Sequence, residues 1–176
     1  MTFETGNDIK GVASPAKIST SSTSGNSGKV TLTAGNRIDL NKDINTSSTS
    51  FNGGDITLTA NRIDIDGLIA KSNLGTGGSI NLTSTNNIRF EYADTSGAIQ
   101  GGNFLVNSGG NIRVTDRIGS GACLGSSICT AGGSGGLVSI SHGGNRAFII
   151  GNSAQNGTKG TITTGTSILG LGKVIP

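Results

Sequence analysis

Few residues of the chain carry the chemistry for a site. Cys123 and Cys129 lie in one stretch, ACLGSSICT, and His142 is the single histidine. Outside a reducing compartment, two cysteines at this spacing predict a local disulfide, with two free thiols as the alternative. They do not make a zinc site without a second pair or a nearby histidine, and a lone histidine is typical of a structural residue. The sequence has no phosphate-binding loop, dinucleotide fingerprint, calcium repeat or HExxH motif, so we expect no metal and no cofactor.

Carboxylates suggest a different chemistry. Asp64 and Asp66 have the same parity in one expected strand, RIDID, and would point to the same side. Acidic clusters on β-helices serve polysaccharide lyases and hydrolases, which makes a polysaccharide-active enzyme the enzymatic alternative. Such sites need close carboxylates together with a base or a metal in a groove. Nothing else in the sequence converges on the pair, so we expect that the protein is not an enzyme.

A repeated sequence motif predicts the strands that position these residues. Its copies GKVTLTA, GDITLTA and GSINLTS begin at Gly28, Gly54 and Gly78, a spacing of 24–26 residues. In each copy aliphatic residues alternate with polar ones, mostly threonine, which is the pattern of a strand buried on one face. A unit of ~25 residues that cannot bury its own apolar face predicts a solenoid, in which each unit covers the next.

Three series of strand positions follow from this phrase. The first enters at Val30, Ile56, Ile80, Phe104, Val138 and Val174; the second at Ile38, Ile63, Ile88, Ile112 and near Phe148; the third at Ile18, Ile44, Ile69, Ile99, Ile128 and Ile162. Three positions per repeat predict an all-β, right-handed parallel β-helix, a three-sided solenoid of about five coils of 24–36 residues, over residues 18–176. Residues 1–17 are expected to be a tail or an incomplete N-terminal coil.

The outward residues of the first strand form two columns. They are Thr31, Thr57, Asn81, Leu105 and Ser139 in one, and Thr33, Thr59, Thr83, Asn107 and Ser141 in the other. We interpret them as a solvated ladder that bonds along the stack. Rows of threonine also occur on ice-binding β-helices, but Leu105 and Asn81 interrupt the rows, so ice binding is the weaker alternative.

Charge is sparse and mixed. The chain has 13 basic and 10 acidic residues, a net charge of +3, and no Lys/Arg cluster, so nucleic acid is not expected as a partner. The second strand carries outward charges at Arg37, Asp39, Arg62, Asp64, Arg89 and Arg113. We interpret these as pairs that set the register and keep the surface soluble, with a carbohydrate or cation site as the alternative.

The gap between the second and third strand positions grows along the chain, from six residues (Ile38 to Ile44) to sixteen (Ile112 to Ile128). Insertions along one edge are how solenoids build a distinctive surface, although slack without a role is the alternative. We hypothesise a contact surface at Ala93–Ala98, Asp116–Ser127 and Gly151–Thr161. Its candidate contact residues are Asp94, Arg117, Leu124, Asn152, Gln155 and Lys159.

With these residues laid out, the chain resembles the filamentous-haemagglutinin-type exoproteins of bacterial two-partner secretion. The phrases GGDITLTANRIDIDG and GGNIRVTD look like their repeat. The stretch from Thr130 to Gly165 resembles the end of the β-helical region in large cyanobacterial members, some of which continue into a caspase-like protease domain. The family's N-terminal secretion domain and that protease domain are not in this sequence, so no functional residue is carried over.

The resemblance implies a structural or adhesive rod of an extracellular or cell-surface protein, exported through an outer-membrane secretion partner of the full-length parent. The expected partners are glycans or cell-surface receptors, contacted by a lateral face or a distal domain. Because the ends of a coil stack carry unpaired strand edges, end-to-end self-association is a second hypothesis.

Overall fold

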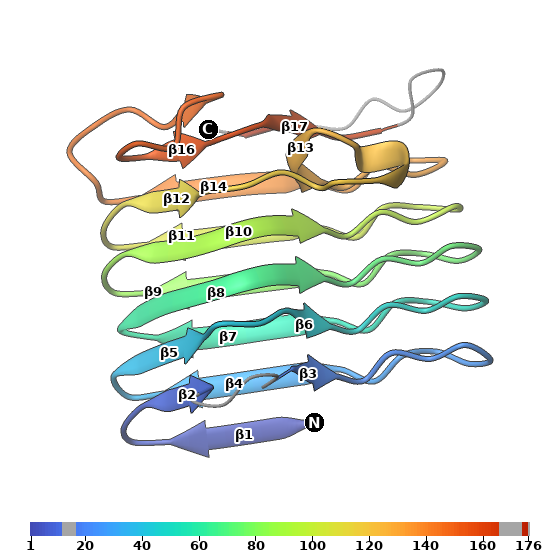
Figure 1. Ribbon diagram of the computed structural model, residues 1–176, viewed down its shortest axis with the longest axis horizontal. Helices are drawn as coiled ribbons and strands as arrows, with labels where there is room; N and C mark the ends of the chain where they lie inside the picture. The colour runs from blue at the N-terminus through green and yellow to red at the C-terminus, as the bar shows by residue number, and fades with distance from the viewer. Residues whose placement is uncertain (12–16, 166–173, 176) are drawn as a thin grey trace.

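The protein is a parallel β-helix made of two sheets whose strands stack coil over coil (Figure 1). This computed structural model describes residues 1–11, 17–165 and 174–175. The first sheet contains, in spatial order, β1 (Thr2–Thr5), β4 (Val30–Ala34), β7 (Ile56–Ala60), β9 (Ile80–Ser84), β11 (Phe104–Ser108), β14 (Val138–His142) and β18 (Val174–Ile175). Every strand pair in it is parallel, as a coil that returns to the same side requires.

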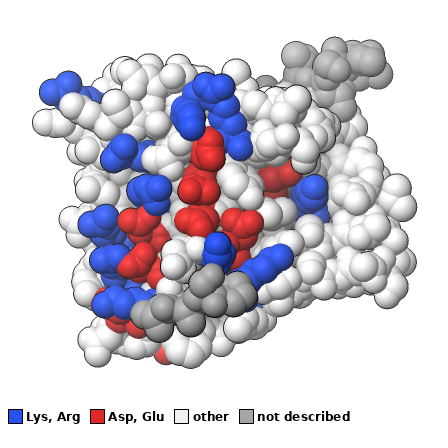
Figure 2. Space-filling model, in the orientation of Figure 1, with Lys and Arg blue, Asp and Glu red and all other residues white. Residues whose placement is uncertain are grey.

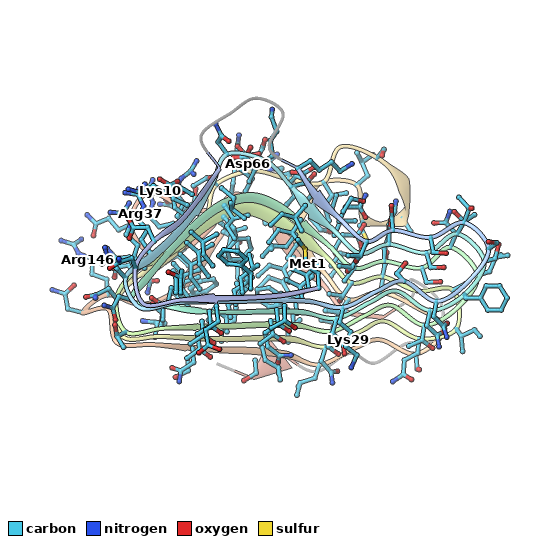
Figure 3. The ribbon with its side chains drawn as sticks, turned by 90° about the horizontal axis from the view of Figure 1, so that it is seen from below. Met1, Lys10, Lys29, Arg37, Asp66 and Arg146 are labelled. Carbon is cyan, nitrogen blue, oxygen red and sulfur yellow. A yellow bond between two sulfur atoms is a disulfide. The ribbon has the colours of Figure 1, made fainter. Side chains whose placement is uncertain are left out.

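The second sheet supplies the other two sides. It contains β2 (Ile9–Gly11), β5 (Arg37–Leu40), β8 (Arg62–Ile69), β10 (Ile88–Asp94), β12 (Ile112–Val114), β16 (Gly157–Thr158) and β15 (Ile149–Ile150), joined by β3 (Ile18–Ser19), β6 (Ile44–Asn45), β13 (Ser126–Cys129) and β17 (Thr161–Thr163). The long strands β8 and β10 pass through both sides, and seen end-on this sheet arches over the flat first sheet (Figure 3). Besides strands, the described residues include one short 3-10 helix, η1 (Gly121–Cys123), and none of their helices is long and apolar enough to span a membrane.

The core is the aliphatic column between the sheets, as the alternating pattern predicts. In the first sheet Ile56 pairs with Ile80, which pairs with Phe104, and all three are fully buried. The rings of Phe90 and Phe104 meet with centroids 5.7 Å apart. Like residues stack on like, so each coil covers the apolar face that the previous coil cannot cover alone.

The third series of strand positions is partly wrong. Ile44 pairs with Leu68, not with Ile69, and the next residue of this column is Ala93 rather than Ile99. The reason is a bend in the strand: two consecutive residues, Asp66 and Gly67, both face outward between the inward residues Ile65 and Leu68, which breaks the alternation (Figure 3). Ile99 lies outside the core, with 64% of its surface exposed.

The second series is wrong in the last coil, where β16 pairs with β12 in place of the stretch around Phe148. Residues 143–156 form an insertion that precedes β16. The insertions therefore do not share one edge: Asp116–Gly125 emerges between second and third positions, residues 143–156 emerge between first and second, and Ala93–Ala98 is no insertion.

The N-terminal residues form a partial coil. β1 pairs with β4, and β2 pairs with β5 in the register Ile9 to Ile38. Residues 12–16 lie outside the described part of the chain. At the other end β18 pairs with β14, which places Val174 opposite Val138 as predicted.

A feature absent from the sequence analysis is a flat projection that we call the flange. It consists of the stacked connections from the third side to the next first strand, residues 20–29, 46–55, 70–79, 95–103 and 130–137, which extend beyond both sheets (Figures 1 and 3). Bridges between neighbouring coils hold it together, such as Ser48 with Ser72 and Thr76 with Gln100. Apolar side chains are exposed near its outer end at Phe51, Leu74 and Ile99.

Glycine lies two residues before β4, β7, β9, β11 and β14 because the coils approach closely at this corner. A Cβ on Gly78 would lie far inside the contact distance of the Gly54 carbonyl, and a Cβ on Gly102 would meet Gly78 in the same way. Buried threonines bind the same carbonyls: the Thr46 hydroxyl donates to Gly54 O at 2.5 Å and the Thr95 hydroxyl donates to Gly102 O at 2.7 Å. This glycine column sets the spacing at which successive coils stack.

The substitution Gly78→Ala is expected to destabilise the protein by about 2 kcal/mol or more, because the atoms that crowd the new methyl group are backbone and must shift. Gly25→Ala in the flange is the control, since its new Cβ would meet only the Ser22 hydroxyl at 3.7 Å. Urea unfolding followed by far-UV circular dichroism measures both. Small and equal losses in the free energy of unfolding for the two variants would contradict the claim that the glycine column sets the coil spacing.

Candidate functional site

A groove of about 940 Å³ lies between the flange and a loop after β12. One wall is the flange, with Lys71, Ser72 and Asn73, and the other wall is Ser120–Cys123. The chain leaves and re-enters the coil at adjacent points, since Ile118 N donates to Ser126 O at 2.8 Å and Gly125 N donates to Ile118 O at 2.9 Å. We call residues 118–125 the disulfide loop.

A disulfide fixes this loop. Cys123 and Cys129 are bonded to each other, and both are buried. Cys129 belongs to β13, so the bond ties the loop to the third side of the coil. The Ser127 hydroxyl adds a hydrogen bond of 2.5 Å to Asp116 O, at the start of the insertion. A loop of eight residues would otherwise sample many conformations, so the cross-link keeps one wall of the groove in place.

Asp94 lies at the base of the groove and is buried. Its Oδ1 accepts hydrogen bonds from Ser96 N at 3.0 Å and from the Ser96 hydroxyl at 2.6 Å, and it lies 3.7 Å from Cys123 Sγ. Asp94, Cys123 and Cys129 could present three ligand atoms within 4.8 Å of one another. Because thiolate is the form of cysteine that binds metals, the disulfide prevents these three residues from forming a metal site.

The lining of the groove is suited to forming hydrogen bonds with a ligand. Its lining carries hydroxyls of Ser72, Ser96 and Thr163, the amide of Asn73, the cation of Lys71 and peptide groups of several glycines. Among the described residues that line it there is no histidine, and Asp94 is the one carboxylate. A polyhydroxylated ligand such as a saccharide matches a lining of this kind better than an apolar ligand does.

The six predicted contact residues do not form one surface. Asp94 is in the groove, and Leu124 projects from the disulfide loop with 69% of its surface exposed. Arg117 and Lys159 lie together nearby: the Arg117 guanidinium donates to Lys159 O, and Lys159 Nζ lies 3.2 Å from Asp116 Oδ1. Asn152 and Gln155 line two smaller hollows at the corner between first and second sides, with residues from other elements.

The sequence analysis missed the flange side of the groove. Lys71, Ser72 and Asn73 lie in a connection that looks like any polar turn when read alone. The usable pattern was the constant Ser-, Thr- and Gly-rich composition of these connections in successive coils, which indicates that they stack.

Acidic residues form a separate column in the middle of the arched sheet (Figure 2). Glu91 lies between Asp66 and Asp116, and its carbonyl accepts a hydrogen bond of 2.9 Å from Asp116 N. Partial burial raises the pKa of Glu91 above its ordinary value of 4.5, and the charges of Asp66 and Asp116 raise it further, against the smaller opposing effect of Arg89. Asp64, the partner proposed for Asp66, is instead paired with Arg89 Nη1 at 2.8 Å and Arg62 at 3.4 Å.

This column meets only part of the requirement for a polysaccharide-active enzyme. Its carboxylates are close together, but it contributes no residue to the groove or to the two smaller hollows. The only histidine lies elsewhere: the His142 ring is within 3.2 Å of Asn156 Nδ2, next to Phe148. Asn156 is buried and accepts a hydrogen bond from Ile112 N at 2.9 Å, so His142 helps hold the insertion 143–156 in place.

The rows of outward threonines have the predicted register. Thr31 lies opposite Thr57, which lies opposite Asn81, and Leu105 and Ser139 continue the same column. The interruptions at Asn81 and Leu105 therefore fall within the row. Ice binding stays the weaker alternative from the sequence, and the solvated ladder stays the prediction.

No family model matches the chain, no curated protein matches it, and no solved structure matches it. The resemblance to filamentous-haemagglutinin-type exoproteins thus remains an expectation drawn from the repeat phrases.

The acidic column predicts a pH-dependent stability. A carboxyl group whose pKa is raised by folding binds more protons in the folded state, so its contribution to stability is present at low pH and is lost as the pH rises through its pKa. The substitution Glu91→Gln removes the carboxylate, so the variant does not lose stability at this position as the pH rises. We expect the variant to have a higher Tm than the original protein at pH 7. The difference between the two Tm values is expected to shrink toward pH 3.5, as measured by circular dichroism.

Glu4→Gln, at an exposed position of β1, is the matched control and is expected to leave the Tm unchanged at both pH values. A Tm difference for Glu91→Gln that stays the same across this pH range would show that the acidic neighbours do not act on Glu91.

Proposed function

We propose that the protein is a structural and adhesive rod segment of a bacterial surface exoprotein, and that it contacts surface glycans through its lateral groove. The observation that carries the proposal is the way in which the groove is built. The stack repeats the same core from coil to coil, while one coil alone adds the disulfide loop and encloses a polar groove against the flange.

Rigidity supports this role. The flange wall is held by bridges between coils, and the opposite wall is held by the disulfide and by backbone bonds that close the loop. A saccharide that binds there would meet donors and acceptors already in position, so little conformational entropy would be lost in the protein. Weak individual sites of this kind suit adhesion, because many copies along a surface add through multivalency.

The rod part of the proposal rests on the continuous hydrogen-bonded stack. A parallel β-helix resists extension along its axis only as far as neighbouring coils stay paired, and here every coil is paired on both sheets. An extracellular or cell-surface location, export through an outer-membrane partner, contact with cell-surface receptors and end-to-end self-association are parts of the same proposal. Light scattering at high concentration tests self-association, which a strict monomer would contradict.

Removal of the groove wall is expected to abolish binding of neutral glycans without unfolding the protein. The variant replaces residues 119–124 by Asn-Gly and carries Cys129→Ala. Because Ile118 and Gly125 are already hydrogen-bonded to each other, a two-residue turn can join them. Binding to glycan arrays and to cells is compared with that of the original protein, and far-UV circular dichroism reports the fold.

The control is Cys123→Ala/Cys129→Ala with the loop at full length. It separates the effect of the cross-link from that of the wall, and we expect it to weaken binding only in part. Unchanged binding by the shortened variant would remove the groove from the proposed function.

A further inference from the structure

A second site lies at the corner between the first and second sides, where the coil register brings arginines together. Asp64 lies opposite Arg89, which lies opposite Arg113. Arg62 precedes Asp64 by two residues in β8, so it lies on the same face of the strand. In the sequence these arginines are separated by 24–27 residues, so they form no cluster there. On the folded protein the basic side chains gather along this corner (Figure 2). Arg37 and Arg146, labelled in Figure 3, lie on the same side of the arch.

These residues border a hollow of about 280 Å³, which we call the notch. Its polar lining consists of Arg62, Asn87, Arg89, Asn111, Arg113 and Gln155. A neighbouring hollow of about 180 Å³ contains Arg146 and Asn152 and shares Gln155 with the notch. The insertion 143–156 therefore covers one end of the basic corner, and it supplies two of the contact residues predicted from the sequence.

The notch holds more positive charge than its carboxylates can balance. Asp64 is the partner of both Arg62 and Arg89, at 3.4 and 2.8 Å. Arg113 has no ion pair among the described residues; its Nε donates to Ser153 O at 2.9 Å, which anchors the side chain. Three arginines against one aspartate leave an excess of positive charge, and an anchored guanidinium can still bind a carboxylate or sulfate through its remaining N–H groups.

The asparagines of the notch offer donors rather than acceptors. Asn87 Oδ1 accepts Asn111 N at 2.8 Å, and Asn111 Oδ1 is buried against the backbone of Gly144. Each amide oxygen is thus turned into the stack, which leaves the amide NH2 groups of Asn87 and Asn111 without a partner among the described residues. A lining of guanidinium and amide N–H groups favours a ligand rich in acceptors.

We propose that the notch binds acidic saccharides, that is, glycan chains that carry carboxylate or sulfate groups. Arg89 and Arg113 lie opposite each other at the strand spacing of ~4.8 Å, which is close to the length of one sugar residue, so neighbouring acid groups of a chain can meet these two arginines. The proposal deepens the glycan contact proposed above and rests on it, but it concerns different residues from those of the groove.

Nucleic acid fits the notch less well than an acidic saccharide does. Single strands bind through aromatic side chains on which bases stack, and the notch has no aromatic residue. Asp64 and the acidic column next to the notch would also repel a continuous phosphate chain.

The experiment measures binding of galacturonate oligosaccharides, dextran sulfate, a neutral glucan of matched length and a single-stranded DNA oligonucleotide by isothermal titration calorimetry. We expect both acidic saccharides to bind at least about tenfold more tightly than the neutral glucan. Arg113→Gln is expected to weaken this binding about tenfold, because it removes the guanidinium that no carboxylate balances. Arg113→Lys keeps the positive charge but loses the paired N–H donors of the guanidinium. Its affinity should therefore lie between that of the original protein and that of Arg113→Gln.

Lys42→Gln is the control: it removes one exposed positive charge outside the notch and the groove, and it should leave the affinity unchanged. Equal losses for Arg113→Gln and Lys42→Gln would overturn the proposal, as would DNA that binds as tightly as the saccharides. Binding of neutral and acidic glycans with equal affinity would overturn the notch proposal while the glycan contact stands. Absence of binding to every saccharide would remove both.

Discussion

Close approach of successive coils at the glycine column is the constraint on which the rest of the structure depends. There the backbone of one coil lies against the carbonyl of the coil before it, and buried threonine hydroxyls complete the contact. Once this spacing is set, every residue has a fixed neighbour one coil away. The aliphatic core, the polar flange and the charged columns of the arched sheet are all results of that one register.

The same dependence explains what the sequence could predict. The first strand is led by glycine and alternates strictly, so its core residues and its outward columns could be identified without a structure. Ile69 and Ile99 could not be placed in the same way, because the strand bends at Gly67 and two consecutive residues, Asp66 and Gly67, face outward. In the last coil, the insertion 143–156 displaces the second strand from Phe148 to β16, and no local pattern marks that change.

Candidate sites were harder to predict than the fold because they combine residues from different coils. The cysteine spacing pointed to the disulfide loop, yet the opposite wall of the groove comes from a polar connection some fifty residues earlier, at Lys71–Asn73. The arginines of the notch were seen as members of pairs, and their excess charge became visible only when Asp64 was found to serve both Arg62 and Arg89. In a solenoid, residues that are one coil apart in the sequence become neighbours in space. Sites of this type are therefore found by comparing residues at the same position in successive coils.

The most direct test of this account is a map of backbone amide shifts during a titration with galacturonate trisaccharide, observed by nuclear magnetic resonance. If the stacked register creates the binding face, the shifted amides will fall in several short segments about one coil apart, around residues 62, 87–89 and 111–113, together with the insertion 143–156. Shifts confined to one contiguous segment, or to the outer end of the flange, would contradict the central claim that binding depends on columns of residues from successive coils.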